Sequence, residues 1–439
     1  MKTFGIITEY NPFHLGHEWQ LQEARNILGQ DCAAVVVMSG SFTQRGEPGI
    51  LDKWDRARAA MACGVNLVLE LPHIYATASA GRFAEGSVKT LAATGIVQNL
   101  VFGSENGNLA DLQEITATLS EDNSEFRSLL KTGLDNGLSW PAARQKAAES
   151  LVGADKAVLL EKSNNILAIE YLKALSLIPR GRRPKPLTIK RQGQDYTGKY
   201  LPEDTYFASA SAIRQTIQEM VRLRNISAHD NLFSNEYMRQ TSEAVANLAK
   251  YMPAPSLAIL MHAYSSKNKL VLPEDLAPQI ITMLRASEPE LLDQFAYMQE
   301  GLGRRLSEAA RRPMINDQDI TNRLQTLLSQ TDTRRFPRTR IQRALIAMLT
   351  QLKADDEIMI SDPQYIRVLA FDKKGRHLLK LMRKYAELPV ITRASDFLEH
   401  GRDSMLWKQA SYDILATDIR SLASGGRCGL DFDTEVVIG

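Results

Sequence analysis

Short apolar runs alternate with segments of helical periodicity through the first 190 residues, and this alternation constrains the fold more than any other feature. The apolar runs are Phe4–Ile7, Ala33–Met38, "VNLVLELP" and "NLVFGSE", with Lys185–Arg191 as a fifth candidate. Continuous apolar runs of this length are typical of strands that are covered on both faces. After the first run, Leu21, Ala24 and Leu28 have helical spacing. A second helical segment ends at Gly64, and a third covers Arg82–Thr94. Strands and helices in alternation, joined by short connections, predict a parallel α/β sheet.

The pattern changes near residue 225, where the strand signal largely disappears. Helical patterns such as "EYMRQTSEAVANLAKYM" and "TRIQRALIAMLTQL" follow, and then a mixed tail. At 439 residues the chain is long enough for two or three domains with ordinary cores. We therefore predict a Rossmann-like parallel-sheet domain over residues 1–225 and a mainly helical region over residues 226–439.

The composition, with 44% hydrophobic and 24% charged residues, is that of a soluble globular protein. Because the formal net charge is only +2, any nucleic-acid surface must be a local cluster of basic residues. Cys32, Cys63 and Cys428 lie far apart, without the spacing of metal ligands, so we predict neither a metal site nor a disulfide framework. The N-terminal apolar stretch is too short for a signal peptide, and no uninterrupted apolar run approaches the roughly 20 residues of a membrane span. We expect a cytoplasmic protein with no membrane association.

The stretch "ITEYNPFHLGHEWQL" (Ile7–Leu21) places His14 and His17 three residues apart where a helix follows the first strand, although the chain has only 7 histidines. In an open parallel sheet, ligands bind at the carboxyl ends of strands, beside helix N-termini that favour phosphate. Residues three apart share one helix face, and imidazoles donate hydrogen bonds and can carry charge near neutral pH. Gly16 leaves room for a base or a phosphate to approach the backbone. For this segment alone, a turn with two partly exposed histidines is an equally good explanation.

The same residues resemble known families. His14-Leu15-Gly16-His17 after a first strand resembles the HIGH motif of the nucleotidyltransferase superfamily, whose members make adenylates from ATP. The longer "ITEYNPFHLGHEWQL" resembles the tRNA(Met) cytidine acetate ligase family. Further matching blocks are "GSFTQRGEPGILDKWDRARAAMACGVNLVLELP", "FAEGSVKTLAATGI", "VFGSE", "SNNILAIEYLKAL", "IKRQGQDYTG" and "SASAIR". The resemblance is dense to about residue 215 and continues more loosely through "EGLGRR", "RRFPRTRIQRALIAML" and "YIRVLAFDKKGR".

This resemblance implies an ATP-dependent ligase that activates acetate as acetyl-adenylate and releases pyrophosphate. The acetyl group would then pass to the exocyclic amine of the wobble cytidine in elongator tRNA(Met), forming N4-acetylcytidine. ATP is implied as a co-substrate, with Mg²⁺ expected beside it, and no tightly bound cofactor is expected. Displacement at the α-phosphate by a carboxylate needs positioning and charge stabilisation more than covalent help from the protein.

The resemblance also implies site residues. His14 and His17 match the phosphate-contacting pair of the superfamily, and we assign them the catalytic role of transition-state stabilisation. The implied ATP-binding segment is Ile7, Thr8, Glu9, Tyr10, Asn11, Pro12, Phe13, His14, Leu15, Gly16, His17, Glu18, Trp19 and Gln20. Further implied ATP contacts are Gly103, one of Asn164 and Asn165, Arg191, Ser211 and Arg214.

These further positions have ordinary structural explanations as well. Gly103 suits a plain turn at a strand end, and an Asn at the start of "NILAIEYLKAL" is usually a helix cap. Lys190 and Arg191 could be solvated, although beside ATP such a pair can bind phosphate, and of the two Arg191 is favoured.

Two loops carry similar alternatives. In "SASAIR", Ser209 or Ser211 can cap the following helix. Capping alone would explain the serines, so the evidence of this motif for phosphate binding depends on Arg214. The glycine-rich "GSFTQRGEPG" after the second strand could close Gln44 and Arg45 over acetate or the acceptor cytidine, and an ordinary surface loop is nearly as good an explanation.

Basic residues gather in two stretches of the second half. Gly301–Thr350 has ten Lys/Arg against four acids, a net charge of +6, and Lys373–Lys384 has six Lys/Arg and no acid. Such runs are usually solvated helix faces, but phosphate contacts supply most non-specific affinity for nucleic acids. Within "RRFPRTR" we predict that Arg335, Arg338 and Arg340 bind tRNA, and that the aromatic residue could stack on an unpaired base.

Three functions therefore compete. The first is an ATP-dependent acetate–tRNA ligase. The second is a small-molecule adenylyltransferase, against which the basic helical half counts. The third is a non-catalytic tRNA-binding protein, against which the intact HxGH and "SASAIR" motifs count. Specificity for acetate comes wholly from the resemblance, and no protein partner can be inferred.

Overall fold

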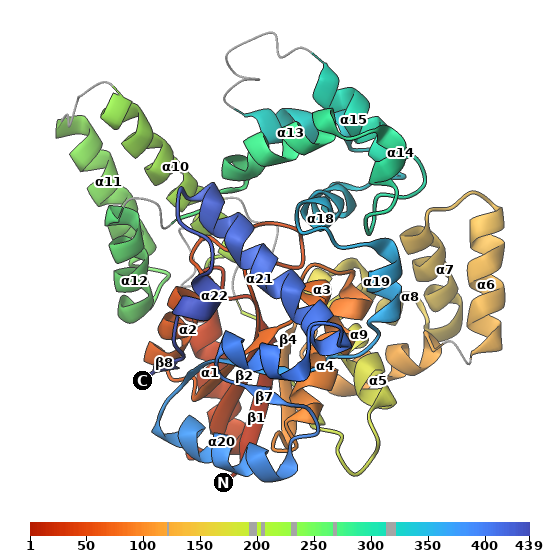
Figure 1. The fold of residues 1–439 in the computed structure, drawn as a ribbon. Coiled ribbons are helices and arrows are strands. Elements are labelled where there is room, and N and C mark those ends of the chain that lie inside the picture. The colour runs from red at the N-terminus through yellow and green to blue at the C-terminus, as the bar shows by residue number, and fades with distance from the viewer. Residues whose placement is uncertain (121–122, 193–199, 203–206, 230–234, 267–269, 313–321) are drawn as a thin grey trace.

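The computed structural model describes residues 1–120, 123–192, 200–202, 207–229, 235–266, 270–312 and 322–439 (Figure 1). Within these residues eight strands form one sheet in the order β5-β4-β1-β2-β3-β6-β7, with β8 paired to β6. The strands are β1 Thr3–Thr8, β2 Ala33–Ser39, β3 Leu67–Leu71, β4 Asn99–Ser104, β5 Lys185–Lys190, β6 Ile366–Phe371, β7 Val390–Ile391 and β8 Val437–Ile438.

Strands β1 to β5 pair in parallel, which confirms the predicted sheet. The helices that follow these strands are α1 Leu15–Leu28, α2 Lys53–Ala62, α4 Ala80–Ala93, α5 Leu109–Thr118 and α9 Ser163–Leu177. The apolar runs of β1 to β4 coincide with strands that are largely buried, whereas β5 lies at the edge of the sheet and is only partly buried. Val35 and Val37 of β2 pack into the same core as α4 and α9, whereas Val36 and Met38 pack with α1 and α2.

The C-terminal part of the chain returns to this sheet. β6 runs antiparallel to β3, with Phe371 opposite Leu67, and β7 and β8 are parallel to β6. Buried ion pairs link the C-terminal part of the chain to the sheet. Lys53 Nζ lies 2.8 Å from Glu70 Oε1 and 2.7 Å from Asp431 Oδ1. These three strands were not predicted. The boundary after residue 225 stays a prediction, but the sheet draws strands from both sides of it.

The remaining helices belong to the mainly helical second half of the chain and, for α3, α6, α7 and α8, to the first half. They are α3 His73–Ala76, α6 Ser124–Asp135, α7 Trp140–Val152, α8 Ala154–Ala157, α10 Ala210–His229, α11 Asn235–Leu248, α12 Ala254–Ser265, α13 Ala277–Ala286, α14 Pro289–Leu292, α15 Leu302–Arg311, α17 Arg323–Thr331, α18 Arg338–Leu349, α19 Ala354–Met359, α20 Lys373–Tyr385, α21 Met405–Ala423 and α22 Leu430–Asp433. α13, α15, α17 and α18 share a hydrophobic core of their own, while α10 and α11 pack together as a projecting pair (Figure 1). None of the helices described here is long and apolar enough to span a bilayer.

Candidate active site

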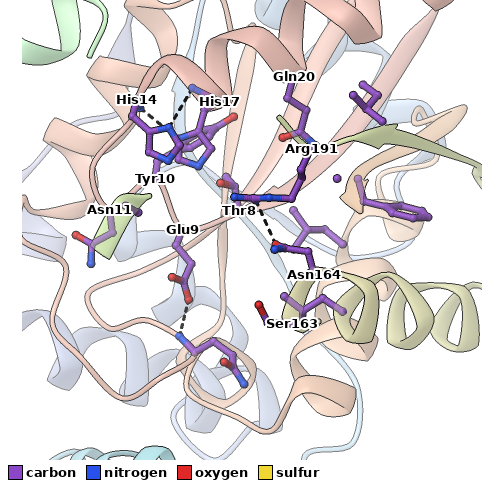
Figure 2. Close-up of a pocket in the computed structure, with 18 of the residues that line it drawn as sticks. Thr8, Glu9, Tyr10, Asn11, His14, His17, Gln20, Ser163, Asn164 and Arg191 are labelled. Carbon is purple, nitrogen blue, oxygen red and sulfur yellow. Dashed lines mark hydrogen bonds between the residues drawn. The ribbon is translucent and has the colours of Figure 1, made fainter. Parts of the chain in front are cut away.

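A cavity of about 320 Å³ lies at the carboxyl edge of the parallel strands, where β1, β4 and β5 end. Its walls come from the loop after β1, the first turns of α1, α9 and α10, and the loop 40–49 that follows β2 (Figure 2). This is the edge at which open α/β sheets bind ligands, and the sequence predicted a site there.

The loop between β1 and α1 is held in place from several sides. Tyr10 takes a left-handed backbone conformation, with φ at 44°. Arg56 Nη1 donates to the carbonyl oxygen of Glu9 at 2.8 Å, and the backbone N–H of Ile50 donates to Asn11 Oδ1 at 2.8 Å. Because buried side chains and backbone fix both sides of Tyr10, the start of α1 reaches the cavity in one defined position.

The two histidines cap α1 and still leave one ring nitrogen each for a ligand. His14 is the N-cap, and its Nδ1 accepts a hydrogen bond from the backbone N–H of Gly16 at 3.1 Å. The backbone N–H of His14 donates to Nδ1 of His17 at 3.2 Å. Since both Nδ1 atoms accept, each neutral ring must carry its proton on Nε2. Capping and phosphate binding are therefore compatible, because they use different nitrogens.

The two rings are neutral. Their centroids lie 3.8 Å apart with planes at 28°, and Tyr10 packs against His17 at 4.8 Å. Burial first, and then the positive charges of Arg191 and Arg214, lower the pKa of His14 to about 3. Burial and the neighbouring His14 and Arg191 also lower the pKa of His17. The sequence suggested that the pair could carry charge near neutral pH, and the structure instead gives two uncharged N–H donors.

Arg191 brings a positive charge to the cavity from the end of β5. Its backbone N–H donates to the carbonyl oxygen of Ser104 at 2.8 Å, and its Nη1 donates to Asn164 Oδ1 at 3.2 Å. Gly103 makes room for this side chain, because a Cβ there would lie 3.2 Å from Cγ of Arg191. Figure 2 shows Arg191 and Asn164 joined on one side of the cavity.

The sequence left open which of two asparagines faces the site, and the geometry separates them. Asn164 lines the cavity. Asn165 is buried, and its Oδ1 accepts hydrogen bonds from the backbone N–H groups of Glu105 and Asn106 at 2.9 and 3.3 Å. Asn165 therefore holds the turn after β4, and Asn164 is the candidate ligand.

Arg214 reaches the cavity from the first turn of α10. Its Nη1 donates to the carbonyl oxygen of Asn11 at 3.2 Å, and its Nη2 lies 3.7 Å from Glu47 Oε2. Of the two serines that could cap α10, Ser209 does so, because its Oγ accepts from the backbone N–H of Ala212 at 3.0 Å. Ser211 does not line the cavity.

Most of the predicted ATP contacts meet in this cavity. Those that line it are Ile7, Thr8, Glu9, Tyr10, Asn11, His14, Gly16, His17, Trp19, Gln20, Gly103, Asn164, Arg191 and Arg214. Those that lie outside its lining are Pro12, Phe13, Leu15, Glu18, Asn165 and Ser211. Phe13 is 1% exposed and packs in the core beneath α1, so it supports the site without facing it.

Several lining residues were missed by the sequence argument. They are Ala80, Phe83, Phe102, Ser163, Ile166, Leu167, Tyr171, Ile189, Gln192 and Ala210. Most of them are apolar positions of helices and strands, and periodicity assigns such positions to the core. No local signal distinguishes a core position from one at the edge of a cavity.

The loop 40–49 connects this cavity to the helical half of the molecule. Gln44 and Arg45 line the cavity, and the backbone N–H of Gln44 donates to Glu9 Oε1 at 2.8 Å. On its other side Gly46 packs against α18, where a Cβ would lie 2.5 Å from the backbone carbon of Gln342. The loop is therefore part of the site and not an ordinary surface loop.

The predicted tRNA-binding residues lie at the N-terminal end of α18, outside the cavity lining. Arg335 and Arg340 lie 3.7 and 3.1 Å from Glu300 Oε2, and both guanidinium groups lie over the ring of Phe336. Phe336 is only 7% exposed and packs in the helical core. The expected stacking of this aromatic on an unpaired base is therefore wrong, because the ring is already covered.

The described residues contain no group of three His, Cys, Asp or Glu side chains that could hold a metal ion. The three cysteines are free, and none of them lines the cavity.

Comparison with known proteins gives consistent matches over the whole chain. The HIGH Nucleotidyl Transferase family model matches residues 1–429. The chain is 37% identical over 447 residues to the tRNA(Met) cytidine acetate ligase of Acetivibrio thermocellus, covering 100% of both chains. It is also 37% identical over 427 residues to the ligase of the same name from Caldanaerobacter subterraneus subsp. tengcongensis, covering 96% of each.

Solved structures of Thermotoga maritima TmcAL are similar along their full length. The apo form I structure superposes with a TM-score of 0.86 at 31% sequence identity, covering 100% of this chain and 99% of that one. The form II structure bound with alpha-thio ATP gives a TM-score of 0.84 at 32% identity and the same coverage.

Proposed function

The chain belongs to the tRNA(Met) cytidine acetate ligase family of HIGH nucleotidyltransferases, and from this premise we propose that it activates acetate with ATP and acetylates the wobble cytidine of elongator tRNA(Met). The observation that carries the proposal is the pair of neutral Nε2–H donors from His14 and His17, which line a cavity together with Arg191 and Arg214. A cavity with these N–H donors and guanidinium groups suits a nucleoside triphosphate.

In the first step an acetate oxygen attacks the α-phosphorus of ATP and pyrophosphate leaves. Negative charge then grows on the α-phosphate oxygens, where the Nε2–H groups of His14 and His17 donate hydrogen bonds. Because both rings are neutral and fixed through Nδ1, they stabilise this charge without giving up a proton. We assign the nucleotide to Asn164 and Arg191, and the outer phosphates to Arg214. None of these steps uses a covalent intermediate on the protein.

We expect Mg²⁺ to reach this cavity bound to the triphosphate, which is the usual way in which nucleotide sites take this ion. The donors that line the described part of the cavity are mainly N–H groups and fit phosphate oxygens. The bound ion would neutralise part of the charge on the phosphates.

The tRNA would approach over the N-terminal end of α18. Arg45 at the cavity, Arg343 and Arg340 are neighbours, since the charges of Arg340 and Arg45 add to the effect of burial in lowering the pKa of Arg343. Nε of Arg343 is buried without a hydrogen-bond partner among the described residues. This row of arginines could guide the phosphates that flank the wobble cytidine from α18 towards the cavity.

The proposal is tested by exchange of labelled pyrophosphate into ATP with the purified protein. We expect acetate to stimulate the exchange in the absence of tRNA, and acetylated cytidine to form when tRNA(Met) is added. Exchange that depends on a different acceptor would identify a small-molecule adenylyltransferase. Binding of tRNA without any exchange would identify a non-catalytic binding protein.

A further inference from the structure

Behind the cavity wall, the carboxylate of Glu105 occupies the N-terminal end of α9. Its Oε1 accepts from the backbone N–H of Asn164 at 3.2 Å, and its Oε2 accepts from the backbone N–H of Asn165 at 2.8 Å. These are two of the N–H groups that a helix leaves unpaired at its start. Glu105 follows β4 and does not line the cavity. The start of α9 is therefore filled by a side chain of the protein, and these two N–H groups are not available to a phosphate.

The same carboxylate sets the direction of the Asn164 amide. Nδ2 of Asn164 donates to Glu105 Oε1 at 2.6 Å, and Oδ1 of the same amide accepts from Nη1 of Arg191 at 3.2 Å, the contact drawn in Figure 2. An ionised carboxylate only accepts hydrogen bonds and a guanidinium only donates them, so the two charged groups fix which end of the amide faces which. Turning the amide over would set its NH2 group against the guanidinium and its oxygen against the carboxylate.

The guanidinium that this amide supports lies close to both histidines. Besides burial, and besides the neighbouring ring in the case of His17, the positive charge of Arg191 lowers the pKa of His14 and His17. The backbone of Arg191 is fixed separately, because its N–H donates to the carbonyl oxygen of Ser104 at 2.8 Å. That bond sets where the side chain begins, and the contact with Asn164 helps to set where the guanidinium ends. The direction of a cavity cation therefore depends on the direction of an amide.

Resting on the proposed function, we propose that Glu105 is a positioning residue for ATP binding, which acts through the Asn164 amide on the guanidinium of Arg191. Glu105 itself does not touch the nucleotide. Because the amide is held before ATP arrives, little ordering of these side chains has to be paid on binding, and affinity gains. The charge of Glu105 works in the opposite direction, since a carboxylate repels a triphosphate. The two effects on ATP affinity have opposite signs, so removing the carboxylate distinguishes them.

Glu105→Ala in the full-length protein tests the proposal, because it removes every acceptor that holds the amide. The Kd for ATP, titrated directly without acetate or tRNA, should rise at least about tenfold, the loss expected for a hydrogen bond to a charged group. A Kd that falls would mean that charge repulsion dominates, and would overturn the inference. Adenylate formation at saturating ATP, trapped as acetyl hydroxamate with hydroxylamine, should stay within about threefold of wild type. The histidines keep their own Nδ1 contacts, so KM should change and kcat should not.

The route through Asn164 is tested by combining two variants. Asn164→Ala removes the amide and leaves both backbone N–H groups that Glu105 caps. In this background Glu105→Ala should raise the Kd for ATP by less than about threefold, because the amide that it orients is gone. Equal rises in the wild-type and Asn164→Ala backgrounds would mean that Glu105 affects ATP by another route, and would overturn the inference.

Asp372→Ala is the matched control, since Asp372 caps α20 in the same manner at the other edge of the sheet. Its carboxylate accepts from the backbone N–H of Gly375 at 2.7 Å and from Nδ2 of Asn66 at 2.7 Å. Loss of this cap should lower the unfolding temperature and leave the Kd for ATP unchanged. If Glu105→Ala gives the same result, Glu105 is only a helix cap and the inference fails.

If Glu105→Ala does not fold, Asn164→Asp decides the question. It leaves the cap of α9 in place and keeps an oxygen for Arg191, but it sets a second carboxylate against that of Glu105. ATP should then bind Asn164→Asp no better than Asn164→Ala, and an affinity near that of wild type would overturn the inference. Absence of acetate-stimulated pyrophosphate exchange in the wild-type protein would instead overturn the proposed function, and the ATP titrations would still decide the role of Glu105.

Discussion

At the scale of single residues, each histidine of the HxGH segment has two roles. One nitrogen of each ring helps to begin α1, and the other remains for a ligand. The sequence could predict that His14 and His17 share a face, because that follows from helical spacing alone. It could not predict their protonation, because burial under Tyr10 and the charge of Arg191 come from the folded arrangement.

The first prediction concerns His17→Ala. Because the imidazole would act mainly on charge that develops in the transition state, ATP should bind with nearly normal affinity. Adenylate formation, measured by hydroxylamine trapping, should be at least about a hundredfold slower, since loss of one well-placed donor costs roughly 3–4 kcal/mol. Transfer from added acetyl-adenylate to tRNA should remain. His377→Ala, an exposed position on α20, is the control.

The alternative for His17 is a purely structural role. In that case His17→Ala would unfold at a much lower temperature, or would form the adenylate at a near-normal rate. Either result would remove the catalytic assignment of the pair.

The second prediction follows from the lowered pKa of His14. A histidine with a pKa of about 3 in the folded protein and about 6.5 when unfolded binds protons mainly in the unfolded state below pH 6.5. Stability should therefore fall as pH decreases, by about 2 kcal/mol at pH 5 from this group alone. His14→Asn keeps a good N-cap and should flatten the decline of the unfolding free energy between pH 7 and pH 5. An unchanged slope in urea titrations would show that His14 is not buried as a neutral ring.

At the scale of elements, the sequence predicted β1 to β4 because their apolar runs are nearly continuous. It gave β5 only as a candidate, because Lys185, Thr188 and Lys190 interrupt the apolar pattern there. β6 was missed because its Arg367 interrupts the apolar pattern, and β7 and β8 are too short to give one. Arg367 is only 2% exposed in the fold, and its Nη2 lies 3.8 Å from Asp431 Oδ1. A buried charge whose partner lies far along the chain cannot be recognised from local periodicity.

The third prediction concerns the contact between the loop 40–49 and α18. Gly46 has φ at +74° and no space for a Cβ, whereas Gly137 has φ at +79° with nothing within 4 Å of the added atom. Gly137→Ala should cost only the backbone strain, roughly 1–2 kcal/mol. Gly46→Ala should lower the unfolding free energy further, because it also pushes the loop away from α18. Equal costs in urea denaturation would mean that the loop does not pack on this helix.

At the scale of the whole molecule, the two basic stretches lie at different ends of the sheet. The stretch at the start of α18 is joined through Gly46 to the loop that lines the cavity. α20, which carries the second stretch, follows Phe371 of β6, and Phe371 lies opposite Leu67 at the start of β3. α20 therefore begins at the amino edge of the parallel strands, and the cavity lies at their carboxyl edge. The sequence located both stretches by their charge and favoured the first also for its aromatic residue, whereas the position of the second stretch in space follows from the antiparallel return of β6.

The last prediction uses this difference in position. Replacing Arg335, Arg338 and Arg340 together by Gln removes three charges at the start of α18 and keeps part of the apolar stems of Arg335 and Arg340 over Phe336. The affinity for tRNA should fall, and the dependence of log Kd on log salt should flatten by about one unit for each lost phosphate contact. ATP binding and hydroxylamine trapping should not change, because these side chains lie outside the cavity lining.

The matched control removes the same charge from the other edge of the sheet. Lys373, Lys374 and Arg376 are exposed on α20, and their joint replacement by Gln lowers the net charge by three as well. If tRNA binds over α18, the control should shift affinity only slightly at moderate salt, since charges more than about 10 Å from the contact are largely screened at 0.1 M ionic strength. Equal weakening by both triple variants would mean that long-range attraction to the whole molecule dominates. Weakening by the α20 variant alone would move the tRNA-binding surface to the opposite edge of the sheet, and the wobble cytidine would then need a different route to the cavity.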